Sequence, residues 1–139
     1  MTAVRLHHVQ VCCPRGGEEE ARRFYAEGLG LSEVDKPAEL AGRGGAWFRS
    51  YDDEGAVTAE LHVGVEEPFA PARKAHPAFV LASVEVLTAT VARLEGLGYP
   101  VDRSECGTFP GHRRVHVGDP HGNRVELLAR SGTTTGENP

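Results

Sequence analysis

The sequence lacks any run of apolar residues long enough to cross a bilayer. A spanning helix needs about 20 such residues, and no segment of the 139-residue chain approaches that length. The chain also opens without the apolar core of a secretory signal peptide, because residues 1–5 lead straight into a strand pattern. These absences predict a cytoplasmic protein with no membrane partner.

Basic residues are neither abundant nor clustered. The chain has 15 Lys and Arg against 20 Asp and Glu, which gives a formal net charge of −5. Proteins that bind nucleic acids displace counterions with a stripe of Lys and Arg, and this sequence has none. We therefore expect no nucleic-acid partner.

Cysteine is also scarce, with three residues in the chain. Cys12 and Cys13 are neighbours in a predicted strand and should point to opposite faces, which makes them poor disulfide partners. Cys106 falls in a predicted loop. We expect free thiols, as in a reducing compartment.

What the chain does have is an internal repeat. Three features recur: Glu27-Gly28-Leu29-Gly30 as Glu95-Gly96-Leu97-Gly98 (95 − 27 = 68), His8 as His76 (76 − 8 = 68), and Ala59-Glu60-Leu61 as Val125-Glu126-Leu127 (126 − 60 = 66). Each half therefore opens with a histidine and closes with a glutamate. A period near 68 is too long for a solenoid and favours two fused modules.

Hydrophobic periodicity and turn residues predict the order βαβββ in each half. The expected elements are strands 4–13, 31–34, 45–51 and 56–64 with a helix from Glu18 to Gly28, then, after a linker at 65–75, strands 76–83, 99–103, 111–118 and 123–130 with a helix at 84–97. This is an α+β fold of two modules, about 4–64 and 76–129, in a single domain over residues 1–130. Residues 131–139 lack apolar side chains, and we expect a disordered tail.

Strand alternation separates an apolar face, which should receive the helices, from a polar one. The polar face is predicted to hold His8, Glu60, His62, His76, Arg114, His116 and Glu126, with Trp47 and Arg49 together on the neighbouring strand. His7 should point to the opposite face and be structural. A sheet with one apolar and one ligand-rich face predicts a curved sheet that forms a cup.

Two imidazoles and two carboxylates related by the repeat make a plausible site for a divalent metal. A buried carboxylate needs a partner or a metal, and His8, Glu60, His76 and Glu126 could supply four ligands around a pseudo-twofold axis. The alternative is a polar floor of salt-linked side chains with no metal. His62 shares the face of Glu60 and could replace it as ligand or line the pocket.

The chain resembles the vicinal oxygen chelate superfamily, which includes glyoxalase I, fosfomycin and bleomycin resistance proteins and extradiol dioxygenases. The matching stretches are Leu6-His7-His8-Val9, Ala21–Tyr25 with Gly28-Leu29-Gly30, His76-Pro77-Ala78-Phe79 and Asp119–Leu127. The resemblance covers residues 4–129. As a set these motifs are specific for the superfamily but not for one activity.

The resemblance implies two βαβββ modules whose sheets form open cups, in a homodimer, with a metal at the cup floor. His8, His76 and Glu126 match the family's metal triad, and Glu60 matches the fourth ligand of glyoxalase I. The metal would be Zn, Ni, Mn, Co or Fe, with Glu126 or Glu60 as catalytic base. Whether one chain or two supply the ligands is left open.

Two functions follow as hypotheses. The first is a metal-dependent lyase, isomerase or dioxygenase that chelates a small oxygenated substrate, with Trp47, Arg49, His62, Arg114 and His116 lining the site. The second is a metal-free protein that sequesters a drug-like or natural-product ligand, as bleomycin resistance proteins do, with Trp47 and Phe69 near the predicted cleft.

Overall fold

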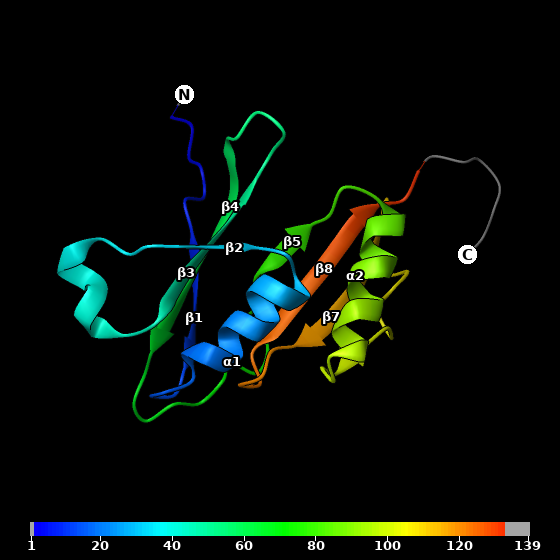
Figure 1. The fold of residues 1–139 in the computed structure, drawn as a ribbon. Helices are drawn as coiled ribbons and strands as arrows, with labels where there is room; N and C mark the ends of the chain where they lie inside the picture. The colour runs from blue at the N-terminus through cyan, green and yellow to red at the C-terminus, as the bar shows by residue number, and fades with distance from the viewer. Residues whose placement is uncertain (1, 133–139) are drawn as a thin grey trace. The chain divides into compact units, whose positions relative to one another are not determined.

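The computed structural model describes residues 2–132. The chain divides into two compact units between Pro71 and Ala72. Each unit has one four-stranded mixed sheet with helical segments (Figure 1). This confirms the predicted α+β fold of two βαβββ modules. Within the described residues, none of the helices combines the length and apolarity that a membrane span requires.

In the first unit, the strand that carries Glu60 lies in the interior of the sheet. Its elements are β1 (Val9–Cys13), α1 (Glu18–Arg22), the π-helix η1 (Arg23–Gly28), β2 (Ser32–Val34), the 3-10 helix η2 (Ala38–Arg43), β3 (Ala46–Tyr51) and β4 (Val57–Val65). The order is β1-β4-β3-β2, with β1 parallel and β3 antiparallel to β4. Side chains of β4 therefore have neighbours on both sides.

The second unit repeats this plan. Its elements are β5 (Ala78–Val80), α2 (Val84–Gly96), β6 (Val101–Asp102), β7 (His112–Gly118) and β8 (Arg124–Arg130). The order β5-β8-β7-β6 places β8 between a parallel and an antiparallel neighbour. Figure 1 shows α2 lying along this sheet, where it contacts β8 and β6.

Local signals explain where the elements of the second unit begin and end. The Ser83 hydroxyl accepts a hydrogen bond from the Val86 amide at 3.2 Å and so caps α2. Leu87, Val91 and Leu94 follow at helical spacing, and all three are buried. The buried stripe fixes which side of α2 faces the sheet.

One glycine of the first unit is required by close backbone packing. Gly45 has φ +84°, and a Cβ at this position would lie 2.1 Å from the Val63 carbonyl oxygen. The Gly45 amide also donates to Glu18 Oε1 at 3.1 Å. These contacts fix the chain immediately before β3, the strand that carries Trp47 and Arg49.

The first strand of each unit is shorter than predicted. The pairing of β1 with β4 begins at Val9, and that of β5 with β8 begins at Ala78, so His8 and His76 precede their strands. The loop after β2 contains η2, which periodicity did not reveal because none of its residues is buried. The predicted disordered tail lies, except for its first two residues, outside the described residues. The single domain predicted over 1–130 stays a prediction.

The sheet registers correct one detail of the repeat. Val9 pairs with Leu61, whereas Phe79 pairs with Leu127. The two central strands match at an offset of 66 (127 − 61), but the first strands match at 70 (79 − 9). His8 precedes Val9 by one residue and His76 precedes Phe79 by three, so the two histidines do not occupy equivalent register positions.

Candidate metal centre

The second unit brings three potential metal ligands together. One ligand atom from each of His76, His116 and Glu126 lies within 4.8 Å of the others. His116 on β7 stands directly opposite Glu126 on β8, and His76 enters from the segment before β5. Within residues 2–132, this trio is the one group of His, Cys, Asp and Glu with such spacing.

The hydrogen bonding of His76 prepares it to bind a metal. Its Nδ1 lies 2.6 Å from the Lys74 carbonyl oxygen. A carbonyl only accepts, so Nδ1 carries a proton, and in the neutral ring Nε2 then presents a lone pair. A histidine ligand usually donates its other ring nitrogen to such a partner, which fixes the tautomer and the ring orientation.

Glu126 is a buried carboxylate held by an arginine. Its side chain is 7% exposed, and Arg114 Nη1 donates to Oε1 at 2.8 Å. Arg114 is fixed in turn by hydrogen bonds to Thr108 Oγ1 at 2.8 Å and Glu105 Oε2 at 3.4 Å. The guanidinium orients the carboxylate and offsets the cost of burying its charge.

The donor set of the second unit fits a divalent cation. His116 Nε2 is buried and lacks a hydrogen-bond partner within the described chain, although it lies 3.2 Å from Glu126 Oε1. Burying an unpartnered polar atom is costly. A metal bound by the His116 nitrogen and the Glu126 carboxylate would satisfy both groups, and two histidines with one glutamate are common ligands of Zn²⁺ and Fe²⁺.

The first unit carries a second buried glutamate. The Glu60 side chain is 4% exposed, and Arg49, directly opposite on β3, donates from Nε to Oε1 at 2.8 Å. Burial alone raises the pKa of Glu60, but the hydrogen bond and charge of Arg49, with a smaller contribution from His62, outweigh it. The pKa of this carboxyl therefore lies below its ordinary value, and Glu60 is ionised at neutral pH.

His62 lies in the middle of a stack of three rings. Its ring is parallel to that of Trp47 at 3.9 Å between centroids, and the ring of His8 lies 4.2 Å away. Burial, together with repulsion from His8, lowers the pKa of His62. The imidazole is therefore neutral near pH 7, and its Nε2, 3.6 Å from Glu60 Oε1, has no hydrogen-bond partner in the part of the chain described.

The prediction for His7 was wrong. Its Nδ1 lies 2.9 Å from His8 Nδ1 and 3.4 Å from Glu60 Oε2, so it is beside the glutamate rather than on the opposite face. Strand alternation does not apply here because residues 2–8 precede β1. The side chain of His7 is 78% exposed.

The two clusters differ in how histidine and arginine are placed. Opposite the glutamate stands Arg49 in the first unit and His116 in the second. The remaining histidine and arginine also come from different strands: His62 follows Glu60 on β4, whereas Arg114 lies on β7 opposite Leu128. Among the described residues, each unit therefore has a buried glutamate paired with an arginine and a buried histidine nitrogen without a hydrogen-bond partner, but the two units place these side chains at different positions.

Comparison with known proteins identifies the family. The model of the Glyoxalase/Bleomycin resistance protein/Dioxygenase superfamily matches residues 5–127. The chain belongs to this superfamily. A search for similar sequences among curated proteins found no match.

Solved structures cover nearly all of this glyoxalase-superfamily chain. A glyoxalase family protein from Bacillus anthracis is 38% identical over 94% of this chain and 100% of its own, with a TM-score of 0.79. TnmS3, an antibiotic binding protein from Streptomyces sp. CB03234, is 25% identical over 94% and 100%, with a TM-score of 0.62. A lactoylglutathione lyase from Agrobacterium tumefaciens, 20% identical over 93% and 96% with a TM-score of 0.65, supports the fold alone.

Within this superfamily fold, the predicted site residues fall into two groups. His8, Trp47, Arg49, Glu60 and His62 form the cluster of the first unit. His76, Arg114, His116 and Glu126 form that of the second. The convergence of His8, Glu60, His76 and Glu126 on one metal stays a prediction.

Sequence reasoning missed Glu105 and Thr108, which hold Arg114 in place. Both come from the loop between β6 and β7, where no periodic pattern predicts which way a side chain points. It also gave His116 only the role of a lining residue. The available signal was the register of the 111–118 and 123–130 hairpin, which places His116 opposite Glu126.

Proposed function

We propose that the chain is a divalent-metal-dependent enzyme of the glyoxalase/dioxygenase type that acts on a small oxygenated substrate. The proposal rests mainly on the buried, unpartnered Nε2 of His116 beside Glu126 and His76. We assign His76, His116 and Glu126 as metal ligands. His8 and Glu60 are the further ligands that the family resemblance implies, and a homodimer is proposed on the same ground.

The side chains divide the work of such a site. When bound, the metal supplies Lewis acidity toward two adjacent substrate oxygens. Glu126 or Glu60 accepts and returns the proton of the reacting carbon, since each is a buried carboxylate with a neighbouring histidine. Arg114 and Arg49 orient these carboxylates, and the flat face of Trp47 with His62 provides a wall for the substrate.

A metal-free binding protein is the second candidate. Arg114 and Arg49 already neutralise the two buried glutamates without a metal. The stack of His8, His62 and Trp47 could contact a planar ligand. The 25% identity to an antibiotic binding protein points the same way.

A thermal-shift experiment separates the two candidates. The protein is stripped with a chelator and then melted with each of Zn²⁺, Ni²⁺, Mn²⁺, Co²⁺ and Fe²⁺, the last under nitrogen. A metal enzyme is stabilised by at least one of these ions, because a ligand that binds only the folded state raises its stability. His76→Ala and Glu126→Gln should lose the response.

His112→Ala is the matched control, since His112 is on β7 but contacts Phe109 and the Pro110 carbonyl oxygen rather than the cluster. It should respond to metal as the wild type does. A wild type that responds to none of the five ions would leave the binding protein as the better account. A response that survives both cluster substitutions would show that the ligands were assigned wrongly.

A further inference from the structure

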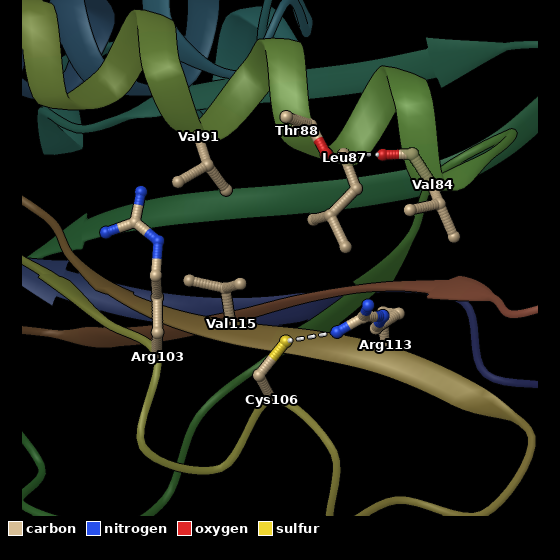
Figure 2. Close-up of a pocket in the computed structure, with 8 residues that line it drawn as sticks. All are labelled: Val84, Leu87, Thr88, Val91, Arg103, Cys106, Arg113 and Val115. Carbon is tan, nitrogen blue, oxygen red and sulfur yellow. Dashed lines mark hydrogen bonds between the residues drawn. The ribbon is translucent and has the colours of Figure 1, made fainter. Parts of the chain in front are cut away.

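A pocket of about 210 Å³ lies in the second unit, on the side of its sheet away from Glu126. Residues 113 and 115 of β7 face this pocket, whereas Arg114 and His116 face the metal-ligand cluster, as strand alternation requires. Helix α2 forms one wall, and the loop after β6 forms the other (Figure 2). The pocket is therefore separate from the candidate metal centre.

Two arginines line the pocket, and they differ in whether a carboxylate pairs with their charge. Arg103 makes two hydrogen bonds to Glu95, at 2.8 and 2.7 Å, so its charge is paired. Arg113 contacts Cys106 Sγ at 3.7 Å and has no carboxylate partner within the described residues. A sulfur atom is a weak acceptor, and a guanidinium has five N–H donors. Arg113 thus retains most of its capacity to bind an anion.

The rest of the lining is mainly apolar. Leu87 and Val91 from α2 and Val115 from β7 are buried and supply apolar side chains to the lining (Figure 2). The Thr88 hydroxyl is already bonded to the Val84 carbonyl oxygen, as the dashed line in Figure 2 marks. A cavity of roughly 150 Å³ is enough to hold benzene, so this pocket suits a ligand slightly larger than benzene.

We propose that this pocket binds a small organic carboxylate, with the carboxylate on Arg113 and the apolar part against Leu87, Val91 and Val115. Guanidinium and carboxylate match in a bidentate geometry, which gives the ligand its orientation. The inference does not depend on a bound metal. It adds a second site to the chain, on the opposite face of the same sheet.

Calorimetric titration with benzoate, isovalerate and benzamide tests the proposal. Benzoate and isovalerate carry the carboxylate, whereas benzamide keeps the shape of benzoate without the charge. We expect saturable binding of at least one carboxylate with a dissociation constant on the order of 1 mM or tighter. Benzamide should bind about tenfold more weakly than benzoate or worse, because it loses a charge-assisted hydrogen bond.

Two substitutions and a control locate the ligand. Arg113→Gln should weaken carboxylate binding by roughly tenfold or more. Thr88→Phe adds a bulky side chain to the pocket lining from an exposed helix position and should abolish binding without disturbing the core. Arg130→Gln removes an exposed arginine at the end of β8 and should leave binding unchanged.

Alkylation of Cys106 gives a second readout in the folded protein. Cys106 lines the pocket, whereas Cys12 lies in the other unit and Cys13 is fully buried. Bound carboxylate should slow the reaction of Cys106 with iodoacetamide, measured by peptide mass spectrometry, and leave that of Cys12 unchanged. Failure of both carboxylates to bind, or equal binding of benzoate by the wild type and Arg113→Gln, would overturn the proposal.

Discussion

Arg114 holds Glu126 in a buried ion pair, and replacing it by glutamine should destabilise the metal-free protein. The pair is joined at 2.8 Å, and the side chains are 21% and 7% exposed. Removing one partner of a fully buried pair costs about 3–5 kcal/mol. Because the Arg114 side chain is partly solvated, we expect a smaller loss, of about 2–3 kcal/mol.

The expected shift in melting temperature follows from the size of the chain. Unfolding entropy near 60 °C is about 2.1 cal/mol/K per residue, or roughly 0.3 kcal/mol/K for 139 residues. A loss of about 2–3 kcal/mol therefore lowers the midpoint by about 7–10 °C. Differential scanning calorimetry of chelator-treated Arg114→Gln measures this shift.

The same variant should regain stability when a metal is added. In the wild type, Arg114 and a metal ion would compete for the negative charge of Glu126. Without Arg114 this competition is removed, so a divalent ion should stabilise the variant more than the wild type. A ligand at 100 times its dissociation constant contributes about 2.7 kcal/mol, which is close to the loss. A midpoint within 2 °C of the wild type without metal, or a smaller metal response in the variant, would refute the reasoning.

Arg113→Gln is the control, because the neighbouring arginine has no carboxylate partner among the described residues. Its free energy of unfolding should change by no more than about 0.5 kcal/mol, as for most substitutions away from a buried network. The two substitutions lie at adjacent positions, and each removes one positive charge. A difference between them therefore reports on the hydrogen bonds of Arg114, of which the one to Glu126 is the most buried.

Two further substitutions test other parts of the structure. The pKa of His62 is lower in the folded protein than in the unfolded chain, so the unfolded chain binds the proton first as the pH falls below about 6.5. Acidification therefore destabilises the folded protein. The variant His62→Asn should lose less stability than the wild type between pH 7.5 and 5.5. Parallel plots of melting temperature against pH for the two proteins would contradict this. Ser83→Ala removes the cap of α2 and should cost about 1 kcal/mol in urea unfolding; an unchanged midpoint would show that the cap contributes nothing.

The fold could be predicted because its signals are local. In the second unit, apolar residues at helical spacing predicted α2. The turn residues at Asp119 predicted the hairpin, and in the structure Asp119 Oδ1 accepts hydrogen bonds from the amides of His121 and Asn123. The first strands were predicted too long because β-rich composition does not show where pairing begins. Val9 and Ala78 are the first residues with a partner in the register.

The candidate site could be predicted only in part. Glu60 and Glu126 were found because the internal repeat places a glutamate at equivalent positions and strand alternation assigns both to the polar face, and both are buried. Their pairing with Arg49 and Arg114 was not predicted, since it depends on cross-strand register and side-chain reach. The stacked order of His8, His62 and Trp47 depends on tertiary packing as well.

Metal stoichiometry of the purified protein tests the central claim most directly. Elemental analysis after dialysis should find a divalent ion bound to the wild type and to His112→Ala, and should find it lost from His76→Ala and Glu126→Gln. The same measurement on His8→Ala and Glu60→Gln decides whether the first unit also supplies ligands. Wild-type protein that retains no ion after incubation with zinc, nickel, manganese, cobalt or ferrous iron would contradict the account.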